Sequence, residues 1–346
     1  MNQKSFINII LVVVIIIFVG AVGYFAFVKK SEPGHLPNVP PPLLGETAYI
    51  PRKEKSALLK LSNRKTITKE INYGSGTENI GVRRGGEGAN TGPASFAVDA
   101  RGNIYISDTV NVRIQVRAPD GTFISSIQLK GQGVGDINID KNGFIYVIGD
   151  SGKLYQYDRT GTFISDLSID RSRLDSGGSM HIIDNSVYIG SAQGDVLIAH
   201  IEHGQLTSPS EQELFEPLQD GILGQSRRRY IVSPKIKARL KGDIEVVERD
   251  GAKSLLTIPD QGIAGIEFIG EDGKGNAYFK TQASSGGISV AVSRFDVNGN
   301  YLDTTPVPGN SYDFFTIKIV TVGEDGTVYQ MMPAKDKLIL RSFLAK

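Results

Sequence analysis

The sequence predicts an all-β protein, a six-bladed β-propeller of four-stranded antiparallel blades, preceded by one N-terminal transmembrane helix and a Pro-rich stalk. Two observations predict the ring. Short runs of alternating apolar residues are separated by glycine-containing turns, and this layout recurs about every forty residues after position 92. Self-similarity at a period of roughly 20–50 residues is typical of solenoids, propellers and arrays. The third observation is a long uncharged stretch near the N-terminus, over residues 6–28.

Residues 92–127 show how one unit is built. Four alternating runs, as half-buried strands require, lie at 96–98, 104–106, 114–116 and 123–127. The turns between them contain Gly102 and Gly121, which can adopt positive φ. Four antiparallel strands in a meander, repeated radially, form a propeller blade and leave only short sheet edges.

Five further units follow, beginning near residues 135, 180, 221, 266 and 317. The 255 residues from 92 to 346, divided by six, give about 42 per unit, which is enough for four strands. The last unit ends after its third strand. We therefore expect residues 66–71 to supply the fourth strand and close the ring, which removes an exposed sheet edge.

The first unit resembles the NHL repeat. The residues that carry the resemblance are Gly92, Pro93, Phe96, Ala97, Val98, Asp99, Gly102, Asn103, Ile104, Tyr105, Ile106, Ser107, Asp108, Thr109, Asn111, Arg113, Ile114, Gln115, Val116 and Gly121. The resemblance is closest over 92–127, less close over 135–167 and 266–346, and least close over 180–260. It implies a β-propeller, commonly six-bladed. It implies no particular activity, because one fold hosts many unrelated functions.

The N-terminal stretch is long enough to cross a membrane. Residues 6–28 carry no charge, and about twenty apolar residues span the hydrocarbon core as a helix. The apolar run continues past the small residues Ala21 and Gly23, whereas a cleavable signal peptide has a shorter apolar region. We therefore expect an uncleaved signal-anchor over 1–30, with a removed signal peptide as the alternative.

The residues beyond the anchor divide into a stalk and one large domain. Residues 31–51 contain six prolines, which favour an extended, semi-rigid linker. Residues 52–346 suit a single β-domain. Positive charges on the two sides of the anchor are nearly balanced, so the positive-inside rule does not orient it. We place the propeller outside the cytoplasm of a cell membrane, as is usual for one N-terminal anchor ahead of a large β-domain.

One segment concentrates positive charge. Residues 227–241 hold seven cations and no acid, namely Arg227, Arg228, Arg229, Lys235, Lys237, Arg239 and Lys241. If 235–241 form a strand, four of these cations lie on one face, which would suit an anionic surface. The competing interpretation is a solvated outer strand whose charge discourages edge pairing. The acids Glu211, Glu213, Glu216 and Asp220 lie just upstream and could neutralise it.

A second polar group lies between two strands of the first unit. Asp108 ends one expected strand and Arg113 begins the next, with Asn111 between them. A charge-assisted hydrogen bond between these side chains, or into the next blade, would lock the blade. Alternatively, the group belongs to a ligand-binding rim, because propeller loops gather at one end of the channel.

The search for catalytic motifs is mostly negative. Thiol nucleophiles and thiolate metal sites are excluded, because the chain has no cysteine. His200 and His203 are spaced for one face of a helix, but they fall in an expected strand and turn, where positions i and i+3 point to opposite faces. The sequence lacks the HExxH, GxSxG and phosphate-loop motifs. We therefore predict no cofactor, no metal site and no catalytic residue.

These observations favour a membrane-anchored, extracytoplasmic propeller that acts as a non-catalytic binding or scaffold module for a protein or glycan. The first alternative is a propeller hydrolase or lyase centred on the channel, for which His181 and convergent carboxylates would be the groups to find. The second is an envelope polyanion binder that uses residues 227–241. A net charge of +1 argues against general nucleic-acid binding. The sequence leaves the oligomeric state open.

Overall fold

The structure, a computed structural model, describes residues 59–85, 90–130, 133–149, 151–170, 179–191, 194–215, 220–232, 241–261, 263–283, 290–309 and 312–345. The chain divides into two units, Met1–Lys53 and Glu54–Lys346. The expected anchor at 6–28 and the stalk at 31–51 lie outside the described residues. No helix in the described part of the chain has the length and apolar character needed to cross a bilayer.

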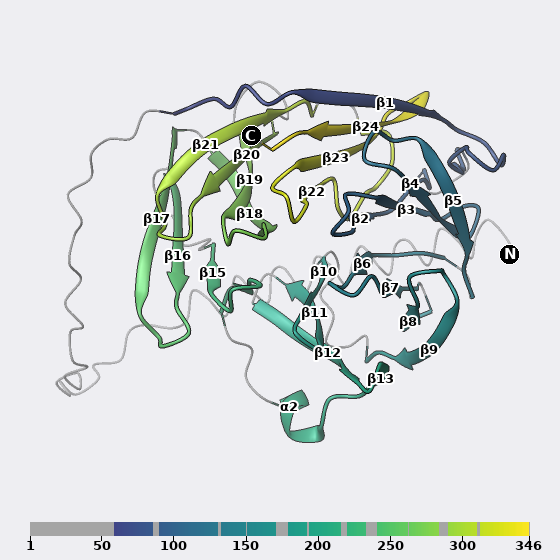
Figure 1. The fold of residues 1–346 in the computed structure, drawn as a ribbon, viewed down its shortest axis with the longest axis horizontal. Coiled ribbons are helices and arrows are strands. Elements are labelled where there is room, and N and C mark those ends of the chain that lie inside the picture. Colours follow the sequence, from purple (N-terminus) through teal and green to yellow (C-terminus); the bar gives the residue numbers. More distant parts are fainter. Residues whose placement is uncertain are drawn as a thin grey trace, which may run out of the picture. The chain divides into compact units, whose positions relative to one another are not determined.

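The second unit is a six-bladed propeller of four-stranded antiparallel sheets (Figure 1), which confirms the predicted ring. The blades are numbered in chain order. Blade 1 comprises β2 (Phe96–Val98), β3 (Ile104–Asp108), β4 (Arg113–Arg117) and β5 (Phe123–Gln128). Blade 2 comprises β6 (Ile137–Ile139), β7 (Ile145–Ile148), β8 (Lys153–Tyr157) and β9 (Phe163–Ser168). Blade 3 comprises β10 (Met180–Ile183), β11 (Ser186–Ser191), β12 (Gly194–Glu202) and β13 (Gln205–Thr207).

The second half of the ring follows the same order. Blade 4 comprises β14 (Ile222–Leu223), β15 (Arg229–Ile231), β16 (Lys241–Val247) and β17 (Lys253–Gln261), and the short helix α2 (Glu211–Phe215) precedes it. Blade 5 comprises β18 (Ile263–Glu271), β19 (Ala277–Ala283), β20 (Val290–Phe295) and β21 (Tyr301–Val307). Blade 6 comprises β22 (Val320–Val322), β23 (Val328–Pro333), β24 (Lys337–Phe343) and, from the N-terminal side, β1 (Thr66–Asn72).

Aspartate-led turns form many of the hairpins. In blade 1, Asp99 Oδ1 accepts hydrogen bonds from the backbone N–H groups of Arg101 (2.9 Å) and Asn103 (2.8 Å). Gly102 follows with φ 81°, a left-handed conformation that favours glycine. The Asp99 carboxylate also accepts a bond from the Tyr105 hydroxyl, and burial raises the pKa of that phenol to about 12. The same carboxylate-to-backbone pattern recurs at Asp140, Asp158, Asp272 and Asp296.

The strand expected over 66–71 is β1, and it closes the ring. It pairs antiparallel with β24 from Thr66 opposite Phe343 to Asn72 opposite Lys337. Most of β1 is exposed, but Ile71 is buried and packs with Leu338 and Met331 of blade 6. The chain just upstream contributes one isolated bridge, between Leu61 and Thr304 of blade 5.

We predict that Ile71→Ala lowers the free energy of unfolding by about 2–5 kcal/mol, because it empties a buried site at the closure. Urea-induced unfolding followed by tyrosine fluorescence measures the loss. The matched control is Thr68→Ala, at an exposed position of the same strand, which should change stability by less than about 0.5 kcal/mol. Equal small effects at both positions would show that β1 does not hold the ring closed.

Candidate functional site

Apolar clusters seal five of the six interfaces between blades. Each contains buried side chains from two neighbouring blades: blades 1 and 2, 2 and 3, 4 and 5, 5 and 6, and 6 and 1. Within the described residues, no such cluster joins blades 3 and 4. This interface therefore differs from the rest of the ring.

Strand alternation in blade 3 explains the difference. Successive side chains of a strand point to opposite faces of the sheet. On β10 and β11, Met180, Ile182 and Val187 join the apolar cluster shared with blade 2. The intervening His181 and Tyr188 are paired across the two strands, and their rings stack at 5.6 Å between centroids. The face that blade 3 turns toward blade 4 is therefore largely polar.

The result is an open groove of about 1040 Å³ between the two blades. Its walls come from the first and last hairpins of both blades and from the segment around α2. The lining residues include Asp184, Asn185, Ser186, Tyr188, His200, Glu202, Ser208, Ser210, Glu213, Leu223, Arg227, Arg229, Val247, Glu248 and Arg249. The volume is in the range of small-ligand sites, and the lining mixes both charge signs with a few apolar groups.

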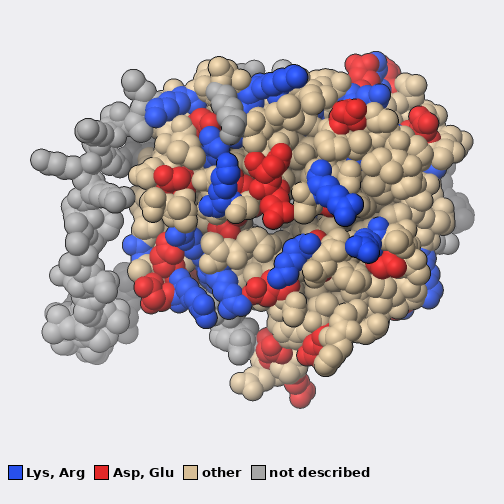
Figure 2. Space-filling view, in the orientation of Figure 1, with Lys and Arg blue, Asp and Glu red and all other residues tan. Residues whose placement is uncertain are grey.

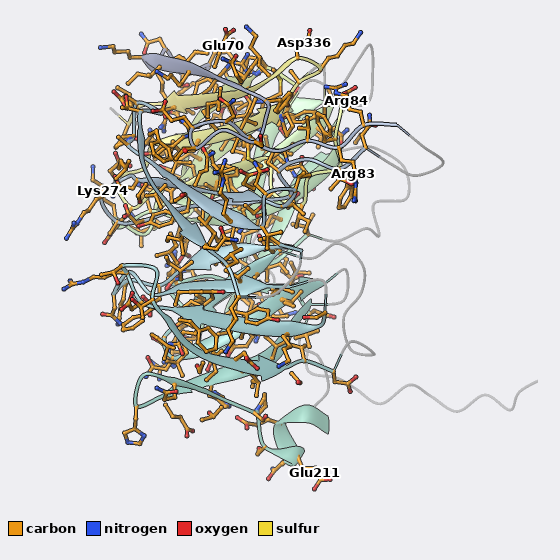
Figure 3. The ribbon with its side chains drawn as sticks, turned by 90° about the vertical axis from the view of Figure 1, so that its right-hand side faces the viewer. Glu70, Arg83, Arg84, Glu211, Lys274 and Asp336 are labelled. Carbon is orange, nitrogen blue, oxygen red and sulfur yellow. The ribbon has the colours of Figure 1, made fainter. Side chains whose placement is uncertain are left out.

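The groove opens on one face of the ring. The hairpins that join the first and second strands lie on the same face in every blade, because the blades share one topology. Lys274, in this hairpin of blade 5, lies on the opposite face from Arg83 and Arg84 (Figure 3).

On the face viewed in Figure 2, acidic and basic side chains are interspersed, so no broad field of one sign covers it.

His200 connects three elements of the groove. Its Nδ1 lies 3.1 Å from Ser186 Oγ, on the neighbouring strand β11, and its Nε2 lies 3.0 Å from Glu213 Oε1, on α2. Ser186 and His200 are register partners across β11 and β12. The imidazole keeps about a quarter of its surface exposed, so this row of polar groups can be reached from solvent.

A capping box positions Glu213. Ser210 donates two hydrogen bonds to Glu213 Oε2, from its backbone N–H (2.8 Å) and its hydroxyl (2.7 Å), and the Glu213 N–H returns one to Ser210 Oγ (3.3 Å). The bonds from Ser210 hold the pKa of Glu213 below its usual range. From the sequence, Glu213 is expected only as a charge that could neutralise the basic segment. The spacing of Ser210 and Glu213 is the signal that could have predicted its fixed position.

A second histidine–acid pair lies on the same face of blade 3. His181 Nε2 lies 3.2 Å from Asp195 Oδ1, without the alignment of a hydrogen bond, and the Asp195 side chain is fully buried. Asp195 Oδ2 accepts a bond from the Leu223 N–H of blade 4. His181 thus faces the interface between blades 3 and 4, where it contacts Tyr188 and Asp195, and it joins no channel cluster among the described residues.

The three arginines that begin the basic segment are paired with acids or with backbone. Arg227 forms an ion pair with Asp184 of blade 3, and Arg228 Nε lies 2.9 Å from Glu248 Oε2. Arg229 donates to the Gly221 carbonyl oxygen (3.3 Å). The acids in these pairs, Asp184 and Glu248, are not the upstream acids that the sequence offered to neutralise the segment. Lys235, Lys237 and Arg239 lie outside the described residues, and Lys241 begins β16.

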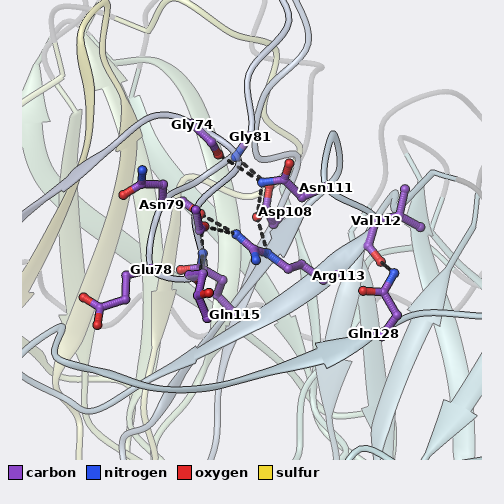
Figure 4. A network of polar contacts seen from close by, with 12 residues as sticks. Gly74, Glu78, Asn79, Gly81, Asp108, Asn111, Val112, Arg113, Gln115 and Gln128 are labelled. Atoms are coloured by element: carbon purple, nitrogen blue, oxygen red, sulfur yellow. Dashed lines mark hydrogen bonds and ion pairs between the residues drawn. The ribbon is translucent and has the colours of Figure 1, made fainter.

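The polar group in blade 1 joins the ring to the segment that follows the closing strand. Asp108 is buried and accepts bonds from the Gly81 N–H (2.7 Å), Asn111 Nδ2 (2.9 Å) and Arg113 Nε (2.8 Å). Arg113 also donates to the carbonyl oxygens of Gly76 and Asn79 (Figure 4). These contacts hold residues 74–81 against blade 1 and leave the carboxylate no free face for a ligand.

Near the inner strands, one buried carboxylate contacts four blades. Asp136, in the loop that leads into β6 of blade 2, is 2% exposed. It accepts bonds from the Ser95 hydroxyl of blade 1 and the Met180 N–H of blade 3. Lys318, at the entrance to blade 6, lies 3.2 Å away and also donates to the Ile137 carbonyl oxygen (3.0 Å). Asp136 and Lys318 therefore have structural partners, and the sequence held no motif that would have identified them.

The two histidines that are spaced for one face of a helix do not share an element. His200 lies within β12, whereas His203 follows that strand in a turn with φ 50°. Over the described parts of the chain, no group of three or more histidines and carboxylates could hold a metal ion.

We predict that Asp136→Ala lowers the free energy of unfolding by about 3–5 kcal/mol, since it removes the counter-ion of the Lys318 ammonium and the acceptor of three buried donors. Thermal and urea unfolding of the variant measure the loss. Asp336→Ala, at an exposed carboxylate, serves as control and should stay within about 0.5 kcal/mol of the parent. A loss below about 1 kcal/mol for Asp136→Ala would contradict the role of this carboxylate as a junction.

Of the comparisons with known proteins, only the comparison with solved structures found similar proteins. No family model matches the sequence, and no curated protein matches it significantly. Virginiamycin B lyase from Staphylococcus aureus has a similar structure, with 14% identity, coverage of 81% of this chain and 100% of that chain, and a TM-score of 0.43. A DUF4221 family member from Bacteroides vulgatus has 10% identity, coverage of 81% and 96%, and a TM-score of 0.48.

The Pan2 WD40 domain from Neurospora crassa is also similar, with 12% identity, coverage of 74% of this chain and 76% of that chain, and a TM-score of 0.42. At these identities and TM-scores, the comparisons assign no activity to this chain.

Proposed function

We propose that the chain is an NHL-type propeller, anchored in a cell membrane through residues 6–28, which binds a partner outside the cytoplasm in the groove between blades 3 and 4. The supporting observation is that this interface holds a polar groove and, as far as the described residues extend, lacks the apolar cluster that seals each of the other five. A ring that only supported itself would gain stability by sealing this interface as it seals the others.

The charges of the groove favour a polypeptide as the partner. Arg229 and Arg249 are on the blade 4 wall, and Glu202 and Asp184 are on the blade 3 wall. A peptide segment carries donors, acceptors and charges of both signs, which match this lining, whereas a polyanion would be repelled by the acids. The pairing of Arg227 and Arg228 with acids further weakens the case for a polyanion surface.

We predict that Arg229→Glu reduces capture of the partner at least tenfold, because it reverses the charge of a groove side chain that donates to a backbone carbonyl oxygen. The full-length chain, in detergent, is used to capture its partner from an envelope extract. Arg101→Glu, at an exposed hairpin position of blade 1, has the same change of charge and should capture as well as the parent.

Equal capture by both variants would exclude the groove as the binding site. Capture of a protease-resistant polysaccharide that depends on Arg229 would keep the groove but overturn the polypeptide as its ligand.

The anchor and its orientation have a separate test. We predict that the full-length chain stays in the membrane pellet after alkaline carbonate washing, and that Val14→Arg combined with Ile16→Arg releases it, because each Arg costs about 3 kcal/mol at the centre of a membrane helix. Val14→Leu with Ile16→Leu is the control.

For orientation, alkaline phosphatase fused after Lys346 should be active, since its disulfides form only outside the cytoplasm. An inactive phosphatase fusion together with a fluorescent cytoplasmic reporter fusion would reverse the orientation. Retention of the double Arg variant in the pellet would refute the anchor.

A further inference from the structure

The groove holds a hydroxyl, an imidazole and a carboxylate in one row. Ser186 Oγ lies 3.1 Å from His200 Nδ1, and His200 Nε2 lies 3.0 Å from Glu213 Oε1. All three side chains line the groove. We propose that Ser186 is an activated nucleophile that attacks carboxylic esters, with His200 as its general base and Glu213 as the group that orients the base. Such rows occur on unrelated folds and are recognised by geometry and roles, not by position in the sequence.

Glu213 determines where the protons lie. An ionised carboxylate can only accept hydrogen bonds, and the bonds from Ser210 hold the pKa of Glu213 below its usual range. The proton of the neutral imidazole therefore sits on Nε2, where it is donated to Glu213. This leaves the Nδ1 lone pair to accept from the Ser186 hydroxyl, which is the arrangement that general-base activation of a serine requires.

Each member of the row is held by a different part of the framework. Ser186 and His200 sit opposite each other on paired strands, while the capping box with Ser210 fixes Glu213 on α2. Here Nδ1 faces the serine and Nε2 faces the carboxylate, which is the reverse of the serine protease arrangement. Proton transfer requires only that one nitrogen accept while the other donates.

The reaction would be ester hydrolysis with water as the second reactant. Ser186 Oγ forms a bond to the carbonyl carbon while its proton passes to His200 Nδ1. The bond from that carbon to the leaving oxygen breaks, and the alcohol departs with this proton. Water then attacks the acyl-serine, gives a proton to Nδ1 and releases the acid. Ser186 regains its proton from His200, so no oxidant, reductant or metal is consumed.

The test uses the full-length chain, a biotinylated fluorophosphonate and p-nitrophenyl acetate. We expect the fluorophosphonate to modify Ser186, as located by peptide mass spectrometry, and Ser186→Ala to abolish both labelling and ester turnover. His200→Gln should slow both by roughly 100-fold or more, the usual contribution of a general base. Ser125→Ala, at an exposed position of β5 outside the groove, and Glu211→Gln, in the same helical turn as Glu213, are matched controls that should retain the parent rates.

Glu213→Gln should slow labelling at least tenfold, because an amide no longer enforces the Nε2 tautomer. An unmodified Ser186 in the folded parent, or ester turnover by Ser186→Ala at the parent rate, would overturn the proposal. Mapping of the label on the parent chain decides the question even if a variant fails to fold. Capture of a partner in the groove does not depend on this chemistry, so the proposed binding function can stand if the nucleophile fails.

Discussion

Every blade of a propeller has two faces to bury, because each sheet stands between two neighbours. The strands must therefore carry apolar residues at successive positions on both faces, as Ile145, Tyr146 and Val147 do in blade 2. Blade 3 meets this requirement on one face only. Toward blade 4 it presents His181, Tyr188 and His200, and the groove between blades 3 and 4 follows directly from that choice of residues.

Two other devices allow the ring to tolerate this interface. The closing strand β1, from the N-terminal side of the domain, pairs with β24 near the C-terminus. This pairing links the two ends of the ring. Asp136 connects blades 1, 2, 3 and 6 through buried polar contacts. Blade 4 lies outside that junction, and Asp195 supplies a comparable contact to Leu223 at its first strand. Polar contacts thus join blades 3 and 4, whereas apolar packing joins the other neighbouring blades.

The repeat predicted the ring because its signals are local: alternating runs, glycine turns and a missing last strand are all visible along the chain. The site was much less visible. Ser186, His200 and Glu213 come together only because β11 pairs with β12 and the chain then turns back through α2. Arg227 and Arg228 looked like free cations because their partners, Asp184 and Glu248, belong to hairpins that only the fold brings near. The spacing of these residues along the sequence does not predict either set of contacts.

Hydrogen exchange of the full-length chain tests most directly whether the interface between blades 3 and 4 is the open, ligand-binding one. If it is, the amides of 220–232 in blade 4 exchange before those of 263–283 in blade 5. Addition of the captured envelope partner then slows exchange in 220–232 and in the groove segment 200–213. Local opening is easiest where few apolar contacts must be broken. Uniform exchange in the two blades, or slowing centred on Asp136 and Lys318, would contradict the account.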